Sequence, residues 1–233
     1  MLRWIVVVLL IVVGISFYVS HQRDASGASS SATATAATAS VATGASAGAA
    51  AAPTVLANGC TPPADIAFGD GAVQSAAPGD MGSFRHGDAT ITPLAGFSVD
   101  ARVLSAKRYG SDREARYAPI DLALGWGRMR DDAVLSQLDI SQSGRWYQYR
   151  WSNQAPIPQD EIVRSSANMH MIPSNEAVAD ALESIDDDDR IRIDGWLVQV
   201  EAQDGWRWRS SLTRDDQGGG ACEVVYVCAV AKR

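Results

Sequence analysis

The residue whose type and setting could do chemistry is His170, which lies in the segment 165–173. Alternation along an extended segment places its side chain on the same side as that of Asn168. An imidazole beside an amide and a carboxylate can serve as a general base or a metal ligand, and Asp121 is a candidate for the carboxylate. The competing interpretation is a half-buried histidine that is hydrogen-bonded to backbone groups and has no chemical role.

The residues after His170 read Met-Ile-Pro-Ser-Asn and lead into an expected helix. With the histidine they resemble the His-x-x-Pro element of HNH-type nucleases, which implies a metal-dependent, nuclease-like hydrolase centred on His170. The segment departs from that element because no histidine follows it in the chain. The aspartates Asp186–Asp189 lack the spacing of a calcium loop, and the glycines Gly218–Gly220 lack the Lys-Ser/Thr of a phosphate loop. We therefore expect no metal ion and no cofactor.

Aromatic residues are the second group that could form a site, since six of the seven tryptophans lie between residues 126 and 208. Most are expected in the core, where large rings dominate burial. A subset on an open face, interleaved with arginines, would bind a peptide or a glycan by stacking. The predicted binding residues are Trp146, Trp196, Trp206, Arg207, Trp208 and Arg209.

The stretch 190–230 reads as three strands separated by two turns. Its first strand is apolar at Ile191 and Ile193, but after Gly195 the apolar residues fall on the other phase. A one-residue slip would turn the apolar side chains to solvent. The pattern therefore predicts a β-bulge at Asp194–Gly195.

The turn after this strand contains Asp204 and Gly205. A three-residue loop with Gly205 in the left-handed conformation pairs Val200 with Trp208 and Ala202 with Trp206. A two-residue loop would instead place apolar residues opposite charged ones. We predict the three-residue loop.

The fold class predicted from these patterns is α+β, with one small, bent β-barrel or half-barrel and two or three short helices. Before residue 190 the expected elements are a strand over Ala95–Tyr109, an apolar loop over Ala118–Gly127, a short helix from Asp131 or Asp132 to Leu138, a strand over Gly144–Trp151, helical turns over Pro158–Arg164, and a helix capped by Ser174 with Val178, Ala181, Leu182 and Ile185 on its buried face.

The block Ile191–Val230 resembles the oligonucleotide/oligosaccharide-binding barrel. The expected helix Asn175–Ile185 precedes this block instead of separating its strands, which indicates a rearranged relative. The segments DLALGWG, SANMHMIP and GWRWRSSL are similar to those of uncharacterised bacterial single-pass membrane-anchored proteins, and this resemblance implies no activity.

The N-terminal part is expected to attach the domain to a membrane. Trp4–Val19 is apolar except for Gly14 and Ser16, which predicts an uncleaved signal anchor over 1–24, with a cleaved signal peptide as the alternative. Residues 25–58 are almost wholly Ala, Ser, Thr and Gly and predict a disordered tether, followed by a Pro/Gly-rich connector over 59–86. The globular domain is expected over 87–233. This organisation is typical of a protein in the bacterial inner membrane, with its C-terminal domain in the periplasm.

The three cysteines restrict the disulfide pairing. Cys222 and Cys228 lie in one expected strand, about 20 Å apart at 3.4 Å per residue, whereas a disulfide needs α-carbons within about 7 Å. A bridge would therefore join Cys60 to one of them, and we favour Cys222. Three reduced thiols in a cytoplasmic protein are the alternative.

The net charge of −7 argues against a nucleic-acid partner, because such affinity comes mainly from neutralised phosphates. We therefore expect a membrane-tethered envelope domain that acts as a non-enzymatic binding or interaction module for a protein or cell-wall glycan. The alternative is the hydrolase centred on His170.

Overall fold

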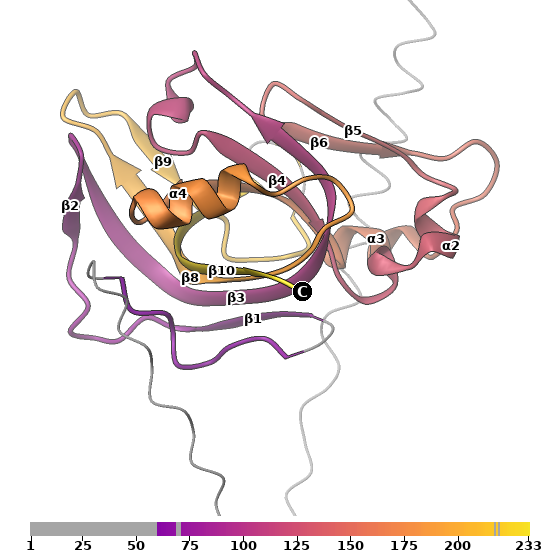
Figure 1. Ribbon diagram of the computed structural model, residues 1–233, viewed down its shortest axis with the longest axis horizontal. Coiled ribbons are helices and arrows are strands. Elements are labelled where there is room, and N and C mark those ends of the chain that lie inside the picture. Colours follow the sequence, from indigo (N-terminus) through magenta and orange to yellow (C-terminus); the bar gives the residue numbers. More distant parts are fainter. Residues whose placement is uncertain (1–59, 69–70, 217, 219) are drawn as a thin grey trace, which may run out of the picture. The chain divides into compact units, whose positions relative to one another are not determined.

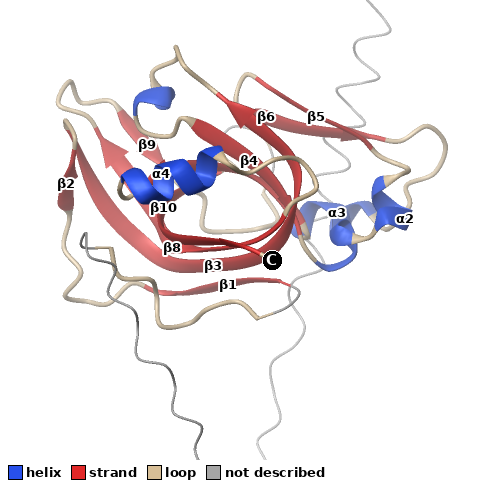
Figure 2. Cartoon of the chain, viewed as in Figure 1, coloured by secondary structure: helices blue, strands red, loops and turns tan. Residues whose placement is uncertain are grey.

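The computed structural model describes residues 60–68, 71–216, 218 and 220–233. Strands dominate this part of the chain, and three short α-helices accompany them (Figure 2). The strands are β1 (Gly71–Ala76), β2 (Phe84–His86), β3 (Ala89–Arg108), β4 (Ile120–Gly125), β5 (Asp139–Ser143), β6 (Trp146–Arg150), β7 (Ser166–Pro173), β8 (Arg190–Glu201), β9 (Arg207–Arg209) and β10 (Glu223–Lys232). The helices are α2 (Asp132–Leu135), α3 (Gln159–Arg164) and α4 (Glu176–Glu183), and Glu114–Arg116 and Gly127–Arg130 form 3₁₀ turns.

The predicted anchor and tether lie outside the described residues. Within those residues, no helix has the length and apolar character needed to cross a bilayer.

Five strands pair in a ring that runs from β3 to β4, β7, β10, β8 and back to β3. The β7–β10 pair is parallel, and the other four pairs are antiparallel. The 20-residue strand β3 is long enough to pair with β8 along its first part and with β4 along its last part. The sheet thus closes on itself, as the small-barrel prediction required.

The interior of the ring is filled by alternate residues of each strand, among them Phe97, Leu122 and Met169. Helix α4 follows β7, the third strand of the ring in chain order, and precedes β8, the fourth. It lies across one mouth of the ring (Figure 1) and adds Val178 and Leu182 to the same core.

The N-terminus of α4 differs from the prediction by one residue. Asn175, not Ser174, is the cap, and its Oδ1 accepts a hydrogen bond of 3.0 Å from the amide of Val178. Ser174 directly follows β7, and its own N–H donates to the carbonyl of Val227 in β10. The turns of α3 are as predicted, whereas α2 ends at Leu135, three residues before the expected end at Leu138.

The predicted bulge of β8 at Asp194–Gly195 is wrong, because β8 pairs continuously with β3 at both residues. The irregularity at this place lies in the other neighbour, β10, whose register shifts between Val227 and Ala229, opposite Gly195 and Asp194. Gly195 is required for another reason: a Cβ there would lie 2.2 Å from the carbonyl oxygen of Tyr226. The apolar residues change face because β8 is buried on both sides. Ile193 and Leu197 face the ring interior, whereas Trp196, Val198 and Val200 belong to a second core outside it.

The turn between β8 and β9 is the predicted three-residue loop. Val200 pairs with Trp208, the amide of Ala202 donates to the carbonyl of Trp206, and Gly205 has a φ of 83°. This prediction is confirmed.

The apolar loop predicted over Ala118–Gly127 is also wrong, because Ile120–Gly125 forms β4, which lies between β3 and β7 in the ring. All six residues of β4 are buried, so the sequence carries no alternation that would indicate a strand. This strand places Asp121 opposite His170 of β7.

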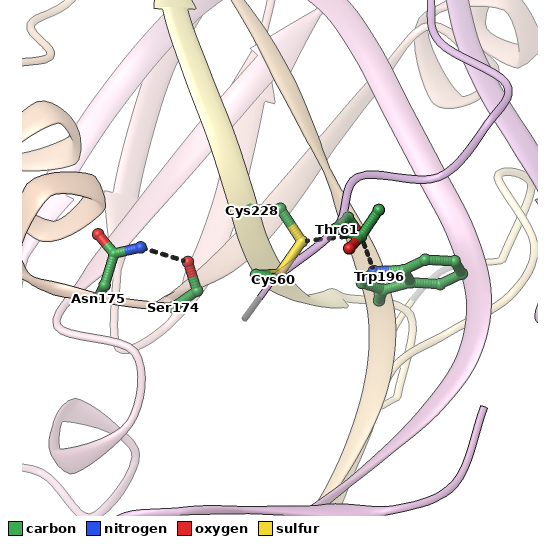
Figure 3. The surroundings of a disulfide bond; sticks show 6 residues. All are labelled: Cys60, Thr61, Ser174, Asn175, Trp196 and Cys228. Atoms are coloured by element: carbon green, nitrogen blue, oxygen red, sulfur yellow. Dashed lines mark hydrogen bonds between the residues drawn. A yellow bond between two sulfur atoms is a disulfide. The ribbon is translucent and has the colours of Figure 1, made fainter. Parts of the chain in front are cut away.

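The connector before residue 87 is part of the sheet, since β1 pairs along β3 and β2 forms a hairpin with the start of β3. A disulfide joins Cys60 to Cys228 and fixes the start of the connector to β10 (Figure 3). The bridge from Cys60 was expected, but its favoured partner, Cys222, is free. The register of β10 against β8 shifts between Val227 and Ala229, and this irregularity, which the sequence does not reveal, falls at Cys228.

Candidate functional site

A pocket of about 190 Å³ lies beneath the β5–β6 hairpin, where β7 and β10 begin. Because β7 and β10 are parallel, both strands begin at the same end of the ring. Helix α4, which follows β7, lies at the other end. The residues that give the pocket its character are Trp146, Tyr147 and Tyr149 on the hairpin side, and Asn168, Arg214 and Glu223 on the barrel side.

The hairpin supplies an aromatic wall. Tyr147 and Tyr149 have ring centroids 5.6 Å apart, and the hydroxyl of Tyr147 donates to Oγ of Ser166. Burial raises the pKa of both tyrosines, so both hydroxyls stay protonated at neutral pH. Trp146, which is 45% exposed, is the first residue of β6 and lines the same pocket.

The opposite side carries a buried ion pair. Glu223 is only 1% exposed, and its Oε1 lies 2.9 Å from Nε of Arg214 in an ion pair, while the Nε–H of Arg214 donates to the carbonyl of Thr213. Oε2 of Glu223 is buried and has no hydrogen-bond partner among the described residues. Burial raises the pKa of Glu223 to about 7, although the Arg214 charge acts in the opposite direction. This carboxyl group can change its charge near neutral pH.

Cys222 also lines the pocket and is the free cysteine of the described residues. Burial raises the pKa of its thiol to about 11, and the neighbouring Glu223 carboxylate adds to the rise. The thiolate is the reactive form of cysteine. Cys222 is therefore a neutral thiol at physiological pH and does not act as a nucleophile.

We compared the chain with protein-family models, curated proteins and solved structures. None of them matches.

The residues predicted around His170 do come together, on the outer side of β4 and β7. Nδ1 of His170 lies 2.8 Å from Oδ1 of Asp121, and the amide of Asn168 lies 3.5 Å from Oδ2. Arg145 donates to Oδ1 of Asp121 at 2.6 Å and binds Asp112 through two hydrogen bonds. We call Asp112, Asp121, Arg145, Asn168 and His170 the polar network.

Arg145 holds the hairpin to the barrel through this network. It lies in the turn between β5 and β6 with a φ of 69°, which is uncommon for a residue other than glycine. Its guanidinium lies 3.8 Å from the ring centroid of Tyr109, and its carbonyl accepts from the amide of Asn168 at 3.0 Å. These contacts position Trp146, the next residue, at the pocket.

His170 has little access to a substrate, because it is only 3% exposed and the ring of Trp208 covers it at a centroid distance of 4.6 Å. Asn168 is the one member of the polar network that also lines the pocket. Among the described residues, no group of three or more His, Cys, Asp or Glu side chains could hold a metal ion.

The six predicted binding residues separate into different places. Trp146 lines the pocket. Trp196 does not lie on an open face: it is 5% exposed, and its Nε1 donates to the carbonyl of Thr61 (Figure 3), so it holds the connector instead. Trp206 packs on Tyr117 at 6.0 Å.

Arg207 and Arg209 are exposed on β9 and donate to Glu201 and Gln199 of β8. They do not line the pocket. Sequence reasoning missed Glu223 and Arg214 as partners and the pair Tyr147–Tyr149 as a wall. Only the strand pattern of 146–150 signals the wall, because its alternate residues must share a face.

Proposed function

We propose that the domain is a non-enzymatic binding module that holds a glycan segment in the pocket beneath the β5–β6 hairpin. The observation that carries this proposal is the juxtaposition of an aromatic wall with a side rich in polar groups. Sugar rings offer an apolar C–H face for stacking and hydroxyl groups for hydrogen bonds. A mostly apolar pocket with a few placed polar groups suits such a ligand.

The arrangement of strands supports this proposal. In chain order, the ring joins its first, second, third, fifth and fourth strands, with one parallel pair and a helix between the third and fourth. We propose that this is an oligonucleotide/oligosaccharide-binding type of barrel without rearrangement, since its first strand is β3 and not β8. Such barrels bind ligands on the face of the second and third strands, with the loop between the fourth and fifth. Here that loop supplies Arg214.

The charge of the site favours a glycan over a nucleic acid. Glu223 and Asp216 provide two carboxylates against one guanidinium, and the whole chain carries −7. A phosphate backbone would be repelled. The polar network supports a structural role for His170 over a hydrolase, because the imidazole is buried beneath Trp208.

We further propose that the domain works outside the cytoplasm, attached to the bacterial inner membrane by Trp4–Val19 and the tether 25–58. The Cys60–Cys228 disulfide supports this location, since such bridges persist in oxidising compartments such as the periplasm. The envelope is also where a bacterial protein meets cell-wall glycan.

Calorimetric titration of the full chain in detergent with the tetramer of N-acetylglucosamine tests the proposed function. We expect binding that Trp146→Ala weakens by at least about tenfold, because an exposed ring at the pocket would be lost. The double variant Arg207→Glu with Arg209→Glu is the matched control, which should bind normally because β9 lies outside the pocket. Loss of binding in the control but not in Trp146→Ala would move the site to β9.

A further inference from the structure

Only one of the two carboxylate oxygens of Glu223 has a partner among the described residues. Arg214 occupies Oε1, whereas Oε2 is buried without a hydrogen bond from the described residues. Buried polar atoms in folded proteins nearly always have a partner, and a missing one requires an explanation. A donor on a ligand in the pocket that Glu223 lines would supply it once the side chain turns Oε2, which is closed to solvent, toward that ligand.

The other pocket groups indicate the kind of donor. Glu223 and Asp216 against Arg214 leave the pocket with an excess of one carboxylate when Glu223 is ionised. Oδ2 of Asp216 already accepts from Oγ of Ser211 at 2.6 Å. The faces of Trp146 and the two tyrosines also attract cations, through their ring quadrupoles.

A hydroxyl group would satisfy Oε2 but leave the extra negative charge without a partner. An ammonium group satisfies both requirements, because it has three donors and a positive charge. Charge-assisted hydrogen bonds of this type are about twice as strong as neutral ones. The pocket volume of about 190 Å³ is below the range that begins at roughly 300 Å³ for drug-sized ligands, so it suits a single ring.

We infer that the pocket is selective for a saccharide residue with a free amino group, which donates to Oε2 of Glu223 while the sugar ring lies against Trp146 and Tyr149. This inference rests on the proposed function, because it specifies the ligand of the same pocket. Glu223 is the residue that determines selectivity, and Arg214 holds its carboxylate in place.

The test is a pair of calorimetric titrations at pH 7, in which the full chain in detergent meets the tetramer of glucosamine and the tetramer of N-acetylglucosamine. We expect the free-amine tetramer to bind at least about tenfold more tightly, the usual minimum for a hydrogen bond between charged groups. Glu223→Gln, which keeps the shape of the side chain and removes its charge, should reduce the difference to about twofold or less. Glu201→Gln, an exposed glutamate on β8, is the control and should leave it unchanged.

The outcomes separate the two proposals. Equal binding of both tetramers to the unaltered chain overturns the selectivity for an amine and leaves the glycan-binding function intact. Binding of neither tetramer overturns the function and the selectivity together. The comparison in the unaltered chain does not depend on a variant, and a thermal melt of Glu223→Gln shows whether that variant folds.

Discussion

Two buried polar clusters lie close together in this barrel and differ in how completely their groups are paired. In the polar network, the carboxylate of Asp121 meets Arg145, His170 and Asn168, and both of its oxygens have partners. In the pocket, Glu223 has one partnered and one unpartnered oxygen. Asn168 belongs to both clusters, so the contrast arises within a few residues.

The difference shows how a structural cluster can be told from a ligand-binding one. A carboxylate whose two oxygens are both partnered, as in Asp121, has no capacity left for a ligand and rigidifies what surrounds it. An incompletely paired group costs stability, and proteins accept that cost where a ligand completes the pairing. The polar network contains the histidine that the sequence singles out, whereas the carboxylate oxygen without a hydrogen-bond partner belongs to Glu223, which lines the pocket.

Removal of the centre of the polar network should give the largest loss of stability. Arg145→Gly eliminates the guanidinium and keeps a residue that adopts a positive φ without strain. We expect the free energy of unfolding to fall by about 3–5 kcal/mol, because two carboxylates lose their buried partner. Urea unfolding of the full chain measures this. Arg207→Ala breaks an exposed pair and should change stability by about 0.5 kcal/mol at most; similar losses in both variants would mean that the network is not structural.

A pH titration of stability sharpens the comparison from the pocket side. The pKa of Glu223 is about 7 in the folded chain, raised from 4.5 by burial. The folded state therefore binds the extra proton, and stability falls as pH rises from about 4.5 to 7. We expect the free energy of unfolding of the unaltered chain, relative to Glu223→Gln, to decrease by roughly 2–3 kcal/mol between pH 5 and pH 8. Parallel pH profiles for the two proteins would contradict a buried, strained carboxylate.

The smallest effect is expected for His170→Asn. It removes one hydrogen bond to Asp121 and the packing on Trp208, so we expect a stability loss of about 1–3 kcal/mol. Binding of the N-acetylglucosamine tetramer should stay within about twofold of the unaltered chain, because His170 does not line the pocket. Unchanged stability with abolished binding would restore the functional interpretation of His170.

The sequence correctly predicted features that are determined by neighbouring residues along the chain. The register at Val200–Trp208 followed from pairing apolar residues, and the sides of β7 followed from alternation at 168–172. The loop predicted over β4 was wrong because a strand buried on both faces does not alternate. The bulge predicted in β8 at Gly195 was wrong because burial changes face along β8, and the register shift opposite Gly195 lies in β10.

The pocket could not be predicted, because its residues are joined only by ring closure. Tyr147 and Glu223 are 76 positions apart, and the parallel pair β7–β10 brings the start of β10 beneath the hairpin. The disulfide partner is likewise set by tertiary structure, which brings Cys60 to Cys228, where the register of β10 against β8 also shifts. Alternation correctly placed Asn168 on the side of His170, whereas the position of Asp121 opposite His170 comes from strand pairing and the burial of His170 beneath Trp208 from tertiary packing.

The most direct measurement of the central claim follows the indole N–H signals of the full chain by NMR while the N-acetylglucosamine tetramer is added. Trp146→Phe assigns one signal and Trp196→Phe another. If the pocket beneath the hairpin is the binding site, the Trp146 signal shifts with saturation, and the Trp196 signal, held on the carbonyl of Thr61, stays in place. A saturable shift elsewhere with a constant Trp146 signal would contradict the account.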